Sequence, residues 1–234
     1  MIKLSQIIIF IALLLLLAVM LVFPIKFGLI RAATVAVVGV LWIDCLFLCR
    51  RHRVLTAGCL LVALMSSAII FWPGNIREPA LRSEYVSALA RYEGKHYLGG
   101  GENRIAVDCS GLLRSALMDA NINYGIKHFR PALLREALLI WWYDSSSQAM
   151  RDGYRQRTFL LFKTPSLNKM DHALIRPGDM AVASNGQHVM AYLGNKVWIE
   201  ADPASKRVIK VTVPAFGIGS FTTPVYLLRW RQLE

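Results

Sequence analysis

The sequence predicts an α+β protein in which about three transmembrane helices precede a domain of helices followed by an antiparallel sheet. First, 55% of the 234 residues are hydrophobic and only 18% are charged, and the excess lies before residue 73, unlike in an ordinary soluble domain. Second, apolar residues recur at helical spacing between residues 82 and 143. Third, short apolar runs separated by turn residues follow from residue 176. We therefore predict an anchor at residues 1–72, a linker at 73–81 and a domain at 82–234.

Three apolar stretches form the predicted anchor, at residues 4–23, 29–49 and 54–72. At 1.5 Å per residue, each helix is long enough to cross a hydrocarbon core of about 30 Å. The first stretch is longer than the apolar core of a signal peptide, and no small-residue cleavage site follows it. We expect it to be retained as the first span.

The basic residues next to the spans predict the orientation. The densest cluster, Arg50-Arg51-His52-Arg53, lies between the second and third stretches, and such clusters stay on the cytoplasmic side. Lys3 and the amino terminus then face the cytoplasm, and the chain after Trp72 lies outside. In a bacterium this describes a multi-pass protein of the inner (cytoplasmic) membrane with its domain in the periplasm.

Four side chains in or beside the spans have simple structural interpretations. Asp44 lies close to the basic cluster, so we expect it to reach the interface or to pair with an arginine. Cys45, Cys49 and Cys59 are expected to pack as small apolar residues, with lipidation or disulfide pairing as the alternatives.

The formal charge of +12 argues against nucleic acid as a partner. The first 72 residues carry six basic side chains and one acidic one, and the remainder of the chain contributes a net +7. The basic residues of the domain are scattered, without a run or aromatic interleaving. Attraction to lipid headgroups or to an acidic polymer accounts for this charge.

Helices are predicted at residues 82–92, 110–121 and 131–143, with a glycine-rich loop at 94–101 between the first two. Asp108 is a suitable N-cap for the second helix and Gly125 a stop signal. Cys109 therefore begins a helix, where unpaired N–H groups and the helix dipole stabilise a thiolate. It is the only cysteine after residue 72 and has no partner for a disulfide within the domain. This combination is typical of a nucleophile.

Strands are predicted at residues 180–184, 188–193, 197–201, 207–213 and 226–230. A three-residue bulged loop centred on Gly194 would place Glu200 directly opposite His188, where Cβ atoms lie about 4.5–5.5 Å apart. Glu200 would then accept a hydrogen bond from one imidazole nitrogen while the other nitrogen faces outward. A two-residue loop would shift the partner and break this pairing.

Four blocks of sequence resemble the NlpC family of papain-like cell-wall cysteine peptidases. They are G-x-x-Y-x-x-G-G (Gly94 to Gly101), D-C-S-G-L (Asp108 to Leu112), R-P-G-D-M (Arg176 to Met180) and H-V-x-x-Y-L-G (His188 to Gly194). They follow in family order over about residues 82–201. The resemblance implies a papain-like fold, in which a helix carrying the cysteine packs on an antiparallel sheet carrying the histidine.

The resemblance also implies roles for individual residues. The residues at the family's functional positions are Cys109 as nucleophile, His188 as base, Tyr97 near the oxyanion site, and Asp108 and Ser110 at the pocket for the stem peptide. The third polar position, usually His, Asn or Gln, is Glu200, with Asp202 as a nearby alternative. A glutamate there should hold His188 more strongly as imidazolium.

The interval from Cys109 to His188 is longer than is usual in the family, which indicates a helical insertion near residues 131–171. Trp141 and Trp142 lie in it. They are expected in the core or at an interface, although the insertion is also placed to form a wall or lid of the cleft.

By this resemblance the protein hydrolyses amide bonds in peptidoglycan stem peptides, specifically between D-glutamate and the diamino acid. We expect no metal or organic cofactor, and His96, His128 and His172 lack metal-ligand spacing. Two alternatives remain. One is a membrane-bound amidase or acyltransferase acting on a lipid-linked substrate, and the other is a catalytically silent scaffold that binds wall partners.

Overall fold

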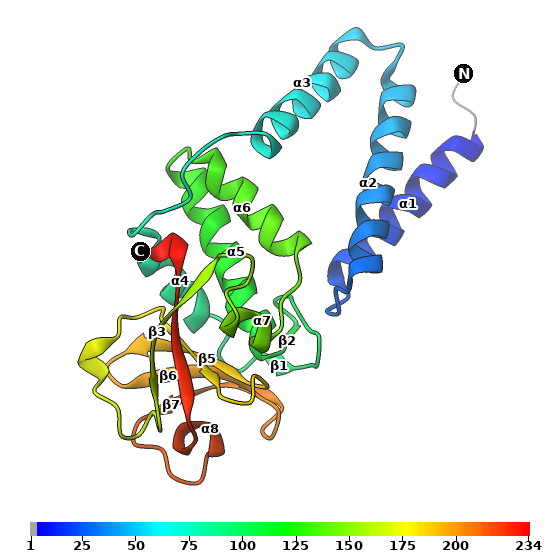
Figure 1. The fold of residues 1–234 in the computed structure, drawn as a ribbon. Coiled ribbons are helices and arrows are strands. Elements are labelled where there is room, and N and C mark those ends of the chain that lie inside the picture. Colours follow the sequence, from blue (N-terminus) through cyan, green and yellow to red (C-terminus); the bar gives the residue numbers. More distant parts are fainter. Residues whose placement is uncertain (1–3) are drawn as a thin grey trace.

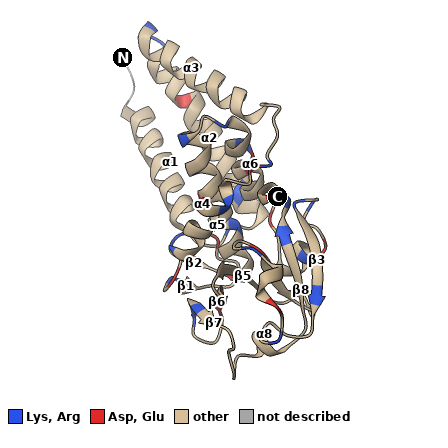
Figure 2. Ribbon diagram, turned by 90° about the vertical axis from the view of Figure 1, so that its left-hand side faces the viewer, with Lys and Arg blue, Asp and Glu red and all other residues tan. Residues whose placement is uncertain are grey.

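The computed structural model describes residues 4–234, so Lys3 lies outside the described residues. Three long apolar helices come first: α1 (Leu4–Val22), α2 (Gly28–Cys49) and α3 (Arg53–Ile70). Their most apolar windows have mean hydropathies of 3.0, 2.2 and 2.0, so each is long and apolar enough to cross a membrane. The basic turn between α2 and α3 lies at the end of these helices away from the rest of the chain (Figure 2).

The remaining chain forms an α+β domain (Figure 1). Its helices are α4 (Leu81–Ala90), α5 (Cys109–Lys127), α6 (Pro131–Trp142), α7 (Ser147–Arg151) and α8 (Gly219–Thr222). Its strands are β1 (His96–Tyr97), β2 (Ala106–Val107), β3 (Thr158–Thr164), β4 (Met180–Ala183), β5 (Val189–Gly194), β6 (Val197–Asp202), β7 (Arg207–Thr212) and β8 (Val225–Trp230). Short 3₁₀ turns lie at His172–Leu174 and Arg231–Leu233.

The strands form one sheet in the order β2-β1-β7-β6-β5-β4-β8-β3. All neighbours are antiparallel except the short pair β1–β2. Strand residues alternate between two faces. Met180 and Val182 pack with α4 and α5 in the larger core, whereas Ala181 packs with Trp198 in a second core on the other face. Helix α5 therefore lies directly against the sheet and is buried along most of its length.

Helix α5 is longer than predicted, because Gly125 does not end it. A Cβ at this glycine would lie 2.9 Å from the Leu134 side chain and 3.2 Å from the Arg130 carbonyl. The glycine thus allows α6 to approach α5 closely, and the helix continues to Lys127.

The segment predicted as a helical insertion is only partly helical. Helices α6 and α7 occupy its first part, but residues 158–164 form β3, which pairs with β8 at the edge of the sheet with a bulge between Leu160 and Phe162. The prediction of a helix over this stretch is wrong, because the free edge of β8 provides a hydrogen-bonding partner that local spacing does not reveal.

The domain also contacts the loop that joins α1 to α2. The backbone N–H of Glu102 donates to the Pro24 carbonyl at 3.0 Å, and the Asn103 side chain donates to the Val22 carbonyl at 2.8 Å. Arg31 of α2 is 1% exposed and donates to the Glu102 carboxylate at 2.7 Å. The apolar helices are therefore bound to the glycine-rich loop that precedes Cys109.

Asp179, immediately before β4, is a fully buried carboxylate. It is 0% exposed and accepts from Arg229 Nε and Nη2 at 2.7 and 2.8 Å and from the Arg176 N–H at 2.7 Å. Removing the charge of one partner leaves the other buried charge uncompensated.

We expect Asp179→Asn to lower the free energy of unfolding by about 3 kcal/mol, measured by thermal or denaturant unfolding of the solubilised chain. Asp152→Asn is the control, because that side chain is 56% exposed and surface pairs contribute about 1 kcal/mol or less. Equal free energies of unfolding for the two variants would contradict the stabilising role of the buried Asp179 charge.

Candidate active site

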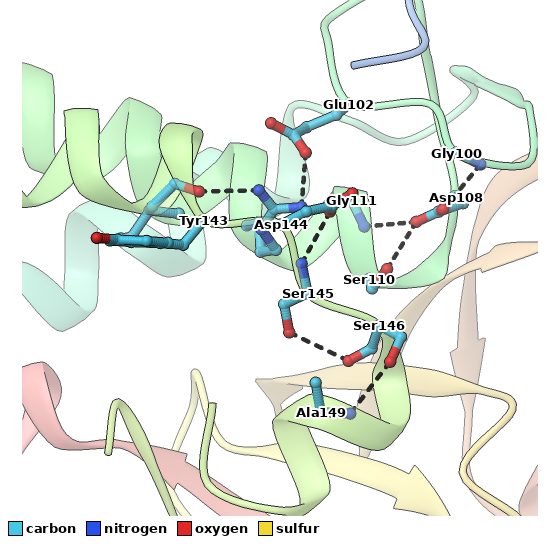
Figure 3. A network of polar contacts seen from close by, with 12 residues as sticks. Gly100, Glu102, Asp108, Ser110, Gly111, Tyr143, Asp144, Ser145, Ser146 and Ala149 are labelled. Atoms are coloured by element: carbon cyan, nitrogen blue, oxygen red, sulfur yellow. Dashed lines mark hydrogen bonds and ion pairs between the residues drawn. The ribbon is translucent and has the colours of Figure 1, made fainter. Parts of the chain in front are cut away.

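Cys109 is the first residue of α5, as its position after Asp108 predicts. Asp108 caps the helix, accepting from the Gly111 N–H at 2.6 Å and from the Ser110 hydroxyl at 3.0 Å. Its other carboxylate oxygen accepts from the Gly100 N–H at 2.9 Å (Figure 3). One carboxylate therefore joins the glycine-rich loop to the start of the cysteine helix.

The loop and the helix approach so closely that Gly111 tolerates no side chain. A Cβ at this residue would lie 2.1 Å from the carbonyl oxygen of Gly101. The same carbonyl accepts from the Asp108 N–H at 3.0 Å. Glycine in the D-C-S-G block is thus required by a backbone-to-backbone contact that sets the position of Cys109.

His188 lies immediately before β5, and its Nε2 is 2.5 Å from Oε2 of Glu200 on β6. Glu200 is 2% exposed, and Ser220 donates to the same oxygen at 3.4 Å. The two residues meet, but not in the predicted register. Ala191 pairs with Ile199 and Tyr192 with Trp198, which is shifted by two residues from the prediction.

The hairpin loop explains the error. Its turn has two residues, Asn195 and Lys196, both with positive φ of 51° and 61°, and the bulge lies one step earlier, between Tyr192 and Gly194. A shift of two residues keeps the side chains on the same face. Glu200 therefore reaches His188 diagonally rather than from the directly opposite position.

His188 is strongly basic in this setting. Burial opposes its protonation, but hydrogen bonds and charge from Cys109 and Glu200 raise its pKa from 6.5 to about 10. Because Nε2 is bound to Glu200, the other ring nitrogen, Nδ1, is left for the thiol. The arrangement favours an imidazolium between a thiolate and a carboxylate.

Asp202, the alternative third residue, is engaged elsewhere. Its carboxylate accepts from the backbone N–H groups of Ala204 and Ser205 at 3.0 and 2.8 Å, and these hydrogen bonds lower its pKa despite partial burial. Glu200 is thus the carboxylate that contacts His188.

Tyr97 lies on β1 and is half-buried close to the nucleophile. Burial raises the pKa of its phenol, and the nearby charges of Cys109 and Asp108 raise it further. Its neutral hydroxyl is able to donate a hydrogen bond at this end of the site.

A residue of the insertion covers the thiol. Ser147, at the start of α7, places its hydroxyl 3.3 Å from the sulfur of Cys109, and the Gln187 carbonyl lies 3.9 Å away. Cys109 is consequently 9% exposed. The sequence predicts an insertion near the cleft, but no pattern in it identifies Ser147 as the residue that contacts the thiol. Trp141 and Trp142, the residues of the insertion that the sequence singled out, lie on α6.

Two cavities flank the site. One of about 550 Å³ borders His188, Glu200 and Asp202. The other, of about 170 Å³, is lined by polar groups that include Asp108 and Ser110, on either side of Cys109 in the sequence.

Arg114, one and a half turns after Cys109, also lines the smaller cavity and is a residue that the sequence did not indicate. It contacts Glu102 and Asp144, each at 2.6 Å. Burial raises the pKa of Glu102 to about 7, although the guanidinium groups of Arg114 and Arg31 oppose this shift. The cavity is thus lined by three carboxylates, of Glu102, Asp108 and Asp144, and by one guanidinium, of Arg114; the three carboxylates are labelled in Figure 3.

Among the described residues, one group has the spacing of metal ligands, and it lies away from this site. The sulfur atoms of Cys45, Cys49 and Cys59, in α2 and α3, lie within 4.8 Å of one another. Cys45 and Cys59 are 3.6 Å apart. The sequence indicated these thiols as packing residues, with lipidation or disulfide pairing as alternatives. It did not indicate a cluster of three, because their proximity depends on how α2 and α3 pair.

The sequence profile described as "NlpC/P60 family" matches residues 94–218. This range contains the glycine-rich loop, α5 and the strands that carry His188 and Glu200. No curated protein matches the chain.

Solved structures match this chain at low identity. NlpC2 from Trichomonas vaginalis is 18% identical over 64% of this chain and 46% of its own, with a TM-score of 0.42. The peptidoglycan hydrolase RipB from Mycobacterium tuberculosis is 21% identical over 69% and 76%, with a TM-score of 0.35. An N-acetylmuramoyl-L-alanine amidase from Bacteroides uniformis is 12% identical over 64% and 99%, with a TM-score of 0.41. The match spans about half of the Trichomonas protein.

The raised pKa of His188 predicts how stability depends on pH. The folded protein binds this proton more tightly than the unfolded chain, so the contribution is complete below pH 6.5 and is lost as pH rises toward about 10. We expect Glu200→Gln to move the His188 titration to lower pH and to reduce this loss, as measured by imidazole NMR and unfolding at several pH values. Asp202→Asn is the control, and an equal shift in both variants would contradict the role of Glu200.

Proposed function

The chain belongs to the NlpC/P60 family, and we propose that it is a membrane-anchored cysteine peptidase that hydrolyses amide bonds in peptidoglycan stem peptides. The observation that carries this proposal is the position of His188 between two groups. Its Nε2 lies 2.5 Å from the buried carboxylate of Glu200, and the interactions of its imidazole with Cys109, at the start of α5, and with Glu200 raise its pKa to about 10.

The proposed reaction uses these three residues in order. The Cys109 sulfur attacks the carbonyl carbon of an amide, and His188, protonated by the thiol, transfers that proton to the leaving nitrogen as the C–N bond breaks. Water then attacks the resulting thioester, giving up a proton to His188, and the carboxylic acid leaves with the thiol restored. Glu200 holds the imidazole in orientation and stabilises its positive charge.

The start of α5 is suited to stabilise the negative oxygen of the tetrahedral intermediate. The first backbone N–H groups of a helix lack intrahelical partners and carry partial positive charge. The Tyr97 hydroxyl is a second candidate donor, since its phenol stays neutral. Donors that are already oriented lower the barrier where the charge develops.

The polar cavity beside Asp108 and Ser110 supports a charged peptide as substrate. It is lined by carboxylates and by the Arg114 guanidinium, so it offers partners for both an amine and a carboxylate. Stem peptides carry both groups near the bond between D-glutamate and the diamino acid. We propose this bond as the one that is cleaved.

One observation favours a second candidate, a catalytically silent wall-binding scaffold. Cys109 is only 9% exposed and is in contact with Ser147. Alkylation distinguishes the two, because a silent thiol reacts no faster than free cysteine near neutral pH, whereas an activated thiolate does.

We expect Cys109→Ala to lower the release of stem-peptide fragments from purified sacculi by about 10⁴-fold or more, measured by mass spectrometry of the soluble products. Cys59→Ala is the matched control and should retain wild-type turnover, because Cys59 lies in α3. Unchanged fragment release by Cys109→Ala would contradict the proposal that Cys109 is the nucleophile.

The proposed topology places the domain outside and the turn between α2 and α3 inside. In a chain whose four native cysteines are replaced, we expect Asn75→Cys to react with a membrane-impermeant maleimide in intact cells. His52→Cys should react only after the membrane is permeabilised, and both positions are exposed. Labelling of His52→Cys in intact cells would contradict the proposed topology.

A further inference from the structure

A cavity of about 600 Å³ lies where the apolar helices meet the domain, outside the site described above. The ends of α1 and α3 contribute Leu21 and Ile69, and α5 and α6 form the other walls. Ligand sites for small molecules commonly have volumes of about 300–1,000 Å³. The cavity is therefore large enough for a substantial part of a lipid.

The cavity has an apolar end and a polar end. Its apolar lining from the domain consists of Met118, Ile122, Leu134, Ala137, Leu138 and Trp141. Its polar lining includes Arg104 and Asp119, which pair at 3.0 Å, and Lys26, whose ammonium donates to the backbone carbonyls of Met20 and Leu21. It also includes Glu102, which is bound through Oε2 only. An amphiphile with an apolar chain and a head group carrying both charges matches this distribution.

Two buried groups at the polar end lack partners. Within residues 4–234, Oε1 of Glu102 and the hydroxyl of Ser115 make no hydrogen bond, although these residues are only 6% and 3% exposed. Leaving a buried polar atom unpaired is costly. A ligand ammonium or hydroxyl donating to Glu102, and an ester or phosphate oxygen accepting from Ser115, would remove that cost.

Helix α6 places the cavity at the membrane surface. At one end Arg135 Nε donates to the carbonyl of Ile70, the last residue of α3, at 2.9 Å. At the other end Arg31 Nη1, in the first turn of α2, donates to the Trp142 carbonyl at 3.3 Å. Helix α6 runs between the end of α3 and the start of α2 (Figure 1). In the proposed topology with three spans, these two ends emerge on the same side, so α6 lies along that surface.

Apolar side chains around the cavity remain exposed on the domain. Leu138 and Trp142 of α6 are 49% and 44% exposed, and Ile122 and Ile126 of α5 are 43% and 63% exposed. Contiguous apolar surface of this kind marks a contact with a partner or membrane. Tryptophan at such a position is typical of the membrane interface.

We propose that this cavity binds a zwitterionic phospholipid of the bilayer, with one acyl chain between α5, α6 and the span ends. The ammonium of the head group is held at Glu102 and Asp119, and the phosphate at Lys26 and Arg104. The proposal rests on the membrane topology of the proposed function, but not on catalysis by Cys109.

The test uses the full chain in vesicles of phosphatidylcholine with a trace of phosphatidylethanolamine that carries a photoreactive diazirine in its acyl chain. Mass spectrometry of the peptides locates the labels. We expect labels on α5 and α6 as well as on the three spans. Labels confined to the spans would overturn the proposal.

Leu138→Glu is the diagnostic variant, and Leu160→Glu on β3 is its matched control, because the two leucines are 49% and 47% exposed. We expect Leu138→Glu to lower labelling of α5 and α6 by about tenfold, since it replaces apolar contact by a carboxylate. Labelling of the spans should persist, which shows that the variant is inserted. An equal loss in both variants would overturn the proposal.

Two further arms complete the test. An otherwise identical phosphatidylglycerol probe should label the domain less, because it lacks the ammonium, and equal or stronger labelling would overturn the head-group assignment. Cys109→Ala should be labelled like the wild type. If that chain keeps its labels while the wild type hydrolyses no sacculi, the lipid site stands and only the proposed catalytic function fails.

Discussion

The position of the domain on its anchor depends on one buried charge cluster, in which Arg31 and Arg114 share the carboxylate of Glu102. The three residues come from α2, from the glycine-rich loop and from α5, and each is no more than 6% exposed. Such a cluster is stable only when all its charges are present, since removing one leaves the others buried and uncompensated. It therefore couples the anchor to the loop and helix that build the active site. The cluster therefore holds α2, the segment at Glu102 and α5 in one relative orientation.

The glycine-rich loop connects the buried charge cluster to the nucleophile Cys109. Asp108 caps α5 with one carboxylate oxygen and binds the loop at Gly100 with the other. The contact between the backbones of Gly101 and Gly111 leaves no room for adjustment. A displacement of the loop would therefore move both Cys109 and the polar cavity beside Ser110, because these lie on either side of the same carboxylate. Asp108 caps α5, and under the proposed function it also positions the substrate.

The segment between α6 and β3 links the face of the domain that contacts α2 and α3 to the thiol. Helix α6 contacts the ends of α2 and α3, and the chain leaves it through Asp144 to reach Ser147, which covers Cys109. Asp144 also contacts Arg114 of the buried cluster. The cover over the nucleophile is thus held by the same charges that hold the anchor. This places the proposed lipid cavity and the proposed catalytic centre on two sides of Glu102, which lines the cavities on both sides.

The sequence by itself determined the features that depend on local pattern: the three apolar spans, the helix that begins at Cys109 under the Asp108 cap, and most of the strands after residue 176. It predicted the contact between Glu200 and His188 from a register of β5 and β6 that is wrong by two residues. The two side chains still lie on the same face of the sheet, because side chains alternate between the faces with a period of two. Only the tertiary structure decided which edge β3 joins, why Gly125 lies inside α5, and that Ser147 and Arg31 approach the site. Helical and strand periodicity depend on residues that are close in sequence. Buried ion pairs and the pairing of edge strands join segments that are distant in sequence, so no local pattern predicts these contacts.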